Sequence, residues 1–166
     1  MKNSQTINFW KKKSDIIKWF KKPKKILVKK RNNYNLFYDD GITNIAYNCI
    51  RKNILKGKGN KKAIILIDEY GDKEEISFIQ LENLVDAFIE HLLSNFSKKE
   101  LYKKPIAIHS SANLCSAISM LACTKLGITH CVIFNDLSSE AIKIRCKLIK
   151  CKIIITSADS KDINKK

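Results

Sequence analysis

The sequence predicts an α/β protein whose parallel sheet is only partial and is flanked by helices. Short runs that are apolar throughout alternate with longer amphipathic stretches, and these runs cover residues 105–109, 131–134 and 153–155. Strands that are apolar on both faces are typical of a parallel sheet covered by helices on both sides. We therefore expect an incomplete α/β domain, preceded by a basic and partly helical extension.

Charge divides the chain at about residue 62. Residues 1–62 hold 18 of the 32 basic residues and three acidic ones, for a net charge of +15, whereas residues 63–166 carry only +1. This division predicts a basic N-terminal extension over residues 1–62 and a truncated α/β domain over residues 63–158. The polar residues 159–166 are expected to form a frayed tail.

The extension contains one predicted helix. The pattern predicts a short amphipathic helix over residues 7–20, which ends before Pro23. Its apolar positions include Trp10, Ile17 and Phe20. From residue 24 to residue 62 the pattern is irregular, with a turn expected at residues 39–41 and a loop at residues 57–60.

A hairpin and a helix open the α/β domain. Two short apolar runs, residues 63–67 and 75–78, flank a polar turn and predict a β-hairpin. Ser77 and Gln80 then form a capping-box signature, in which each side chain bonds the backbone N–H of the other. The helix that follows has one apolar stripe, made of Leu81, Leu84, Val85, Phe88, Leu92 and Phe96.

The remaining elements alternate between strand and helix. Asn113 is the expected N-cap of a helix that ends at Gly127 in a left-handed C-cap, and Ser138 is the expected N-cap of the next helix. The residues expected to face inward from this last helix are Ala141, Ile142, Arg145, Leu148 and Ile149.

The composition argues against nucleic-acid and membrane-spanning roles. Of the 32 basic residues 29 are lysine, whereas proteins that bind phosphates or guanine favour the bidentate fork of arginine. Compositional drift therefore explains the charge more simply, although a basic module that binds nucleic acid or an anionic surface remains an alternative. No window approaches the ~18 apolar residues of a membrane-spanning helix. Without a signal peptide, we expect a cytoplasmic protein with reduced cysteines.

Few residues are candidates for chemistry. The six cysteines show no C-x-x-C pair, and the five glycines form no phosphate-binding loop. The isolated histidines, His91, His109 and His130, are expected to be structural. Adjacent carboxylates bracket a turn, which does not supply the dry pocket that a general acid needs. The sequence therefore predicts no catalytic residue, no metal site and no cofactor for the isolated chain.

Several segments resemble one enzyme family. Residues 120–130, MLACTKLGITH, resemble the MLACARLGAVH stretch of short-chain acyl-CoA synthetases, which are the AMP-forming acetyl- and propionyl-CoA synthetases of the adenylate-forming superfamily. Residues 132–134, followed by residues 138–142 and Arg145, are similar to the family's VVFGGFSAEAL...R. Further segments agree in the same order: Phe9-Trp10, Trp19 with Pro23, Phe37-Tyr38 with Gly41, Asn44 with Tyr47-Asn48, residues 57–59, and residues 76–78 with Leu81.

The departures from the family pattern concern its binding sites. Asn135 and Asp136 stand where the family has Gly-Gly near coenzyme A, so the resemblance implies a cofactor-binding position that is substituted here. Arg51-Lys52-Asn53 replaces the family's Asp-Arg-His, and Lys103-Lys104 replaces its Gly-Asp. The parent family uses ATP, Mg and coenzyme A, but its ATP-phosphate loop, acyl pocket and C-terminal domain have no counterpart in these 166 residues.

The resemblance implies a truncated remnant of the N-terminal part of an acetyl- or propionyl-CoA synthetase, inactive alone. One alternative is a subunit of a split acyl-CoA ligase, completed by a second chain that carries the rest of the synthetase. Apolar faces that later segments of the family would cover are expected to stay exposed in this chain. Each Å² of apolar area left exposed forfeits ~25 cal/mol of stabilisation. We therefore expect the chain to self-associate through these faces.

Overall fold

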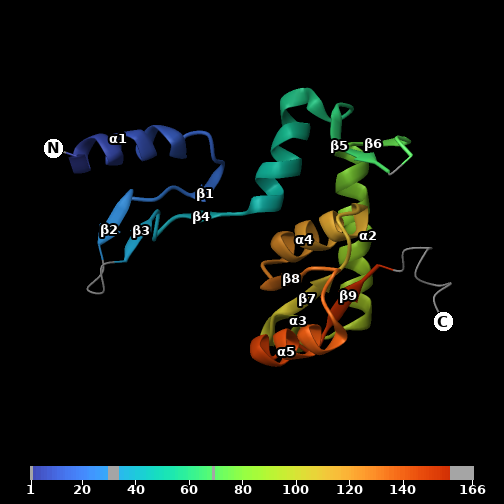
Figure 1. The fold of residues 1–166 in the computed structure, drawn as a ribbon. Coiled ribbons are helices and arrows are strands. Elements are labelled where there is room, and N and C mark those ends of the chain that lie inside the picture. Colours follow the sequence, from blue (N-terminus) through green and yellow to red (C-terminus); the bar gives the residue numbers. More distant parts are fainter. Residues whose placement is uncertain (1, 30–33, 69, 158–166) are drawn as a thin grey trace, which may run out of the picture.

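The computed structural model describes residues 2–29, 34–68 and 70–157, and it contains an N-terminal unit that extends from an α/β body (Figure 1). The unit holds α1 (Lys2–Ser14), β1 (Trp19–Lys21), β2 (Leu27–Lys29), β3 (Asn35–Phe37) and β4 (Ile42–Thr43). A helical segment with two π-helical turns, η1 (Tyr47–Arg51) and η2 (Ile54–Lys58), connects the unit to the body. The expected tail, residues 159–166, lies outside the described residues.

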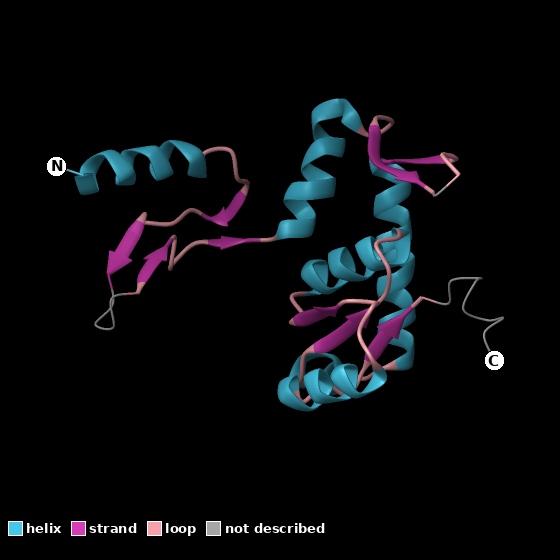
Figure 2. Cartoon of the chain, viewed as in Figure 1, coloured by secondary structure: helices cyan, strands magenta, loops and turns pink. Residues whose placement is uncertain are grey.

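The body contains all the remaining elements. Its strands are β5 (Lys62–Ile67), β6 (Lys73–Ser77), β7 (Ile106–His109), β8 (His130–Ile133) and β9 (Ile154–Thr156). Its helices are α2 (Phe78–Asn95), α3 (Lys98–Lys103), α4 (Leu114–Leu126) and α5 (Ser139–Ile149). Figure 2 shows that helices lie on both sides of the β7–β9 strands.

Trp19 organises the N-terminal unit. Its indole N–H donates a hydrogen bond of 2.8 Å to the carbonyl of Ser14 at the end of α1, and its ring centroid lies 5.3 Å from that of Tyr38. A Cβ atom added at Gly41 would lie 2.6 Å from the indole ring, so this position has no room for a side chain. The helix predicted over residues 7–20 is therefore wrong in its second half, because α1 ends at Ser14. The indole bonds a carbonyl at this helix end, and Trp19 itself pairs with β4.

The irregular pattern predicted for residues 24–62 is also corrected. β2 pairs with β3 in an antiparallel hairpin, and residues 45–58 are helical. Strands of three residues are too short for apolar alternation to identify them. The loop predicted over residues 57–60 is confirmed in part, because Gly57 has a φ of +74° and Gly59 and Asn60 form a turn.

The predicted parallel sheet is confirmed. Its strand order is β8-β7-β9, with Ala107 paired to Cys131 on one side and to Ile154 on the other. In Figure 1, α4 and α5 lie on opposite sides of these strands. Because β7 is the central strand, Ile106 and Ile108 are completely buried. The chain therefore has an incomplete α/β fold with a small parallel sheet.

The predicted hairpin and caps are confirmed as well. β5 and β6 form an antiparallel pair of their own, and Ser77 and Gln80 make the reciprocal bonds of a capping box. Asn113 and Ser138 cap α4 and α5. The unpredicted helix α3 has a capping box too, between Ser97 and Glu100.

Helix α5 is less buried than its sequence predicts. The expected inward positions Arg145 and Leu148 are wrong, because both are exposed, Leu148 to 76%. The parallel sheet has three strands, and α5 packs against its edge strand β8. So narrow a sheet leaves part of the helix uncovered. No residue of α5 is fully buried.

Two buried clusters form the core, and α2 contributes to both. The first joins α2 to the parallel sheet and α4, and contains Leu92, Leu101, Ile106, Ile108, Cys123 and Ile128. The second joins α2 to the helical segment and the hairpin, and contains Ile50, Ile76, Leu81, Val85 and Ala122. No helix within the described residues is long and apolar enough to cross a membrane.

Asn44 links the N-terminal unit to the body. Its side-chain amide donates to the carbonyl of Thr124 near the end of α4, over 2.8 Å. Its side-chain oxygen accepts a bond of 3.0 Å from the backbone N–H of Tyr47 at the start of the helical segment. One side chain therefore satisfies backbone groups at the ends of two helices.

Replacing Asn44→Ala should lower the free energy of unfolding by about 1–2 kcal/mol, because the loss of a capping side chain alone costs about 0.5–2 kcal/mol. Denaturant unfolding followed by circular dichroism measures this change. The matched control is Asn83→Ala, since Asn83 is exposed on α2 and its replacement should leave stability within about 0.5 kcal/mol. Equal stability of the two variants would contradict the linking role of Asn44.

Cys123 should make stability depend on pH in the alkaline range. Burial raises the pKa of its thiol from 9.0 to about 11. The folded chain therefore keeps a proton that the unfolded chain releases, and the free energy of unfolding should fall as the pH rises from 9 to about 11. Denaturation across this range should show a smaller pH dependence in Cys123→Ala. An unchanged slope in Cys123→Ala would refute the assignment.

Candidate functional site

The carboxyl edge of the parallel sheet is a candidate position for a site. β7 leads through α4 to β8 on one side, and β8 leads through α5 to β9 on the other side. The connections therefore diverge at the carboxyl ends of β7 and β9, and ligands of open α/β sheets bind at such a point. Ser110 and Ser157 follow these two strands, so their side chains determine which chemical groups this edge presents.

Ser110, Asn113 and Ser157 form a closed ring of hydrogen bonds at this edge. The Ser110 hydroxyl donates to the Asn113 side-chain oxygen over 3.1 Å, and the Asn113 amide donates to the Ser157 hydroxyl over 3.0 Å. The two hydroxyl oxygens lie 2.7 Å apart. If Ser157 donates to Ser110, every hydroxyl in the ring has one donor and one acceptor partner.

The ring is a structural device. Asn113 also accepts a 3.0 Å bond from the backbone N–H of Ser116 and donates to Ser111 over 3.1 Å. With these bonds, its amide uses both N–H groups and its oxygen accepts twice. The ring therefore ties β7 to β9 and caps α4, and it contains no base that could activate a hydroxyl for nucleophilic attack.

His109 ends β7 beside this ring. Its Nε2 atom is buried and has no hydrogen-bond partner among the described residues. A buried polar atom without a partner costs about 1–3 kcal/mol, so a partner for this nitrogen would stabilise the fold. The other two histidines lie elsewhere, His91 on α2 and His130 at the start of β8.

Asn135 and Asp136, the predicted cofactor position, lie in the turn after β8. Both side chains are exposed, and Phe134 before them is exposed to 76%. Because β8 and β9 lie on opposite sides of β7, this turn is separated from Ser157 by the width of the central strand. The structure thus leaves the two predicted residues apart from the hydrogen-bonded ring.

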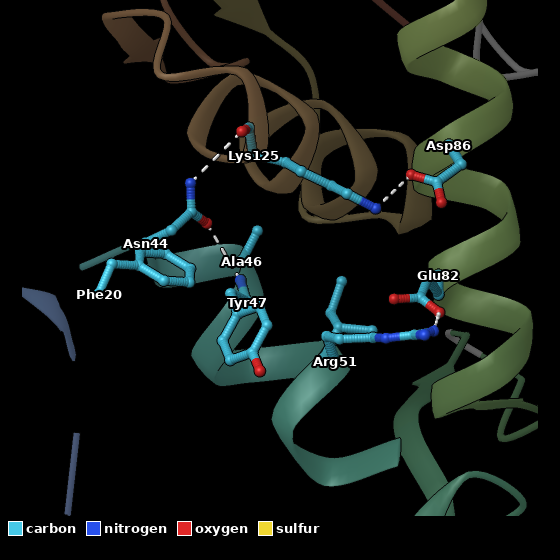
Figure 3. Close-up of a pocket in the computed structure, with 9 residues that line it drawn as sticks. Phe20, Asn44, Ala46, Tyr47, Arg51, Glu82, Asp86 and Lys125 are labelled. Atoms are coloured by element: carbon cyan, nitrogen blue, oxygen red, sulfur yellow. Dashed lines mark hydrogen bonds and ion pairs between the residues drawn. The ribbon is translucent and has the colours of Figure 1, made fainter. Parts of the chain in front are cut away.

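A pocket of about 490 Å³ lies between the helical segment, α2 and the end of α4 (Figure 3). Arg51 points toward Glu82 and pairs with it over 2.9 Å, and Lys125 pairs with Asp86. Asn44 bonds the backbone beside them. The sequence does not predict this pocket, because Arg51 and Glu82 lie far apart in the chain and no motif connects them.

The charges in this pocket have a structural role. Each of the four charged side chains that line it has an opposite partner, and partly exposed ion pairs of this kind contribute about 0.2–1 kcal/mol each. Arg51, which replaces the Asp of the Asp-Arg-His pattern, therefore joins the helical segment to α2. Among the described residues, no three side chains of metal-binding type gather.

Comparison with known proteins supplies what this geometry leaves open. Residues 3–49 match the family described as acetyl-coenzyme A synthetase N-terminus, and residues 52–166 match the AMP-binding enzyme family. The two matches meet next to the pocket, within the helical segment.

Relatives from three genera carry one description, acetyl-coenzyme A synthetase. The protein from Bartonella quintana is 37% identical over 90% of this chain, that from Helicobacter acinonychis 32% over 93%, and that from Streptomyces coelicolor 29% over 91%. In each case the matched region is 23% of the relative. The chain thus spans about a quarter of the length of the curated relatives it matches.

The fold agrees with these matches. A solved structure described as the crystal structure of CmiS6 aligns with a TM-score of 0.58, at 20% identity, over 70% of this chain and 27% of that one. This likeness shows a shared fold. The match over residues 52–166 covers more than half of the sequence, and residues 3–49 match the acetyl-coenzyme A synthetase N-terminus, so the chain belongs to the AMP-binding enzyme family and is similar to the N-terminal part of acetyl-coenzyme A synthetases.

Proposed function

We propose that these 166 residues are the N-terminal fragment of an AMP-forming acetyl- or propionyl-CoA synthetase and do not activate a carboxylate alone. The observation that carries the proposal is the 23% share of the relatives that the chain matches. Acyl adenylation requires ATP phosphates, a carboxylate and a cation held in one site. The polar groups that gather in the described residues are bonded to one another at the sheet edge or paired in the pocket.

The residues after β8 do not fit coenzyme A. The parent family, which uses ATP, Mg and coenzyme A, has two glycines at the position of Asn135 and Asp136, and glycine lets a ligand approach the backbone closely. Two side chains fill that space here, and the carboxylate of Asp136 would repel the phosphates of the cofactor. We therefore assign no step of a reaction to this turn.

Exposed apolar side chains support a partner that covers the sheet. Val132 on the edge strand β8, Phe134 directly after it, Ile154 on the edge strand β9 and Leu148 on α5 are exposed. Uncovered apolar edge strands favour association with another chain. These side chains favour a second candidate, a split ligase in which another chain in the cytoplasm carries the remaining part of the synthetase and covers this surface. When this part is absent, we expect the fragment to self-associate.

The activity of the fragment can be tested directly. The purified chain, mixed with acetate or propionate, ATP, Mg²⁺ and coenzyme A, should release no pyrophosphate, whereas full-length Bartonella quintana acetyl-coenzyme A synthetase serves as the positive control. Release above background by the chain alone would refute the proposal. Adding the remaining C-terminal part of that enzyme as a second chain tests the split arrangement, which predicts release only in the mixture; no release from the mixture would count against it.

Self-association can be measured separately. Sedimentation velocity should show oligomers of the purified chain, and the double variant Phe134→Lys with Leu148→Lys should shift the distribution toward monomer, because both changes place a charge on the exposed apolar surface. The matched control Glu90→Lys changes an exposed position on α2 and should leave the distribution unchanged. A wild-type chain that is monomeric at all concentrations would contradict the exposed-surface argument.

A further inference from the structure

Helix α5 ends in a turn that brings two cysteines together. The backbone N–H of Cys151 donates to the carbonyl of Cys146 over 3.1 Å, and the N–H of Lys150 donates to the carbonyl of Lys147, also over 3.1 Å. Lys150 has a φ of +54°, in the left-handed region. These three features define a Schellman motif. In this motif the residue four positions before the left-handed residue, Cys146, lies against the residue directly after it, Cys151.

Two apolar side chains frequently occupy these positions, but here both positions hold a cysteine. The Cys146 side chain lies close enough to Cys151 to raise the pKa of the Cys151 thiol. A disulfide requires Cα atoms about 4.4–6.8 Å apart, and the backbone hydrogen bond between the same two residues holds their Cα atoms close. Both residues are half-buried, so a small molecule can reach the pair.

The surroundings of the pair are positively charged. Arg145, Lys147, Lys150 and Lys152 flank the two cysteines, and all four are exposed. Cationic neighbours attract anions. A small anionic disulfide such as oxidised glutathione therefore matches the site in both charge and chemistry.

We propose that Cys146 and Cys151 form a redox-active dithiol that closes to an intramolecular disulfide by exchange with a small anionic disulfide. This site is independent of the function proposed above, because it uses neither the sheet edge nor the missing part of the synthetase.

The exchange takes place in two displacements. The Cys146 thiolate attacks one sulfur of oxidised glutathione, which forms a mixed disulfide and releases one glutathione thiolate. Cys151 then loses its proton and attacks the Cys146 sulfur, which releases the second glutathione. The two cysteines lose two electrons, glutathione disulfide gains them, and the two cysteine protons end on the two glutathione thiols.

Cys146 is the attacking thiol in this sequence. Burial, together with the interaction of its side chain with Cys146, raises the pKa of the Cys151 thiol to about 11. Little Cys151 thiolate is therefore present at neutral pH, and the thiolate is the form that attacks. Cys131 on β8 also lies near enough to influence Cys151 electrostatically, which makes Cys131 the competing partner that the experiment must distinguish.

The test is equilibration of the full chain with reduced and oxidised glutathione, followed by alkylation of free thiols and peptide mapping. Cleavage after Lys147 and Lys150 separates the two cysteines, so their peptides stay linked only through a disulfide. We expect a linked Cys146–Cys151 pair, formed at an oxidised-to-reduced ratio about tenfold lower than in the denatured chain, because the folded turn raises the effective concentration of one thiol at the other.

Variants assign the roles of the two thiols. Cys151→Ser should trap a glutathione adduct on Cys146, whereas Cys146→Ser should carry about tenfold less adduct on Cys151, because fewer thiolates form there. The matched control Cys49→Ser removes an exposed cysteine elsewhere and should leave the linked pair intact. A bond between Cys131 and Cys151, equal pairing in the folded and denatured chains, or no linked pair would each overturn the proposal.

Discussion

Burial of α2 on two sides is the constraint on which the rest of the structure depends. Val85 is completely buried between the helical segment and α4, and Leu92 lies about two turns further along, against the parallel sheet. The buried clusters of the two-stranded hairpin and of the three-stranded sheet both include side chains of this helix. A fully buried apolar side chain contributes about 1.5–3 kcal/mol, so the stripe of α2 accounts for much of the stabilisation available to a fold of this size.

Local signals explain which elements the sequence could predict. Ser77, Asn113, Gly127 and Ser138 each set a helix end through a bond or a φ angle within four residues, and the structure confirms all four. The end of α1 depends on Trp19, whose indole bonds a helix carbonyl only because β4 holds the strand in place. Such a tertiary bond leaves no periodic pattern in the sequence.

The candidate site follows the same division. The motif similarity located Asn135 and Asp136 after β8, and the structure places them there. The pairs Arg51–Glu82 and Lys125–Asp86 join segments distant in sequence, so spacing could not predict them. Leu148 was expected to be buried because α5 is amphipathic. Amphipathicity identifies the apolar face of a helix, but it does not show whether the rest of the chain supplies a surface that covers this face.

The hydrogen-bonded ring at the sheet edge has a consequence for the order of folding. Ser110 and Asn113 are synthesised well before Ser157, yet the ring needs all three side chains. While the chain grows on the ribosome, Ser110 and Asn113 can bond each other, but their bonds to Ser157 can form only after β9 has been synthesised. Pairings so distant in sequence form late, since the intervening chain must first lose its conformational freedom.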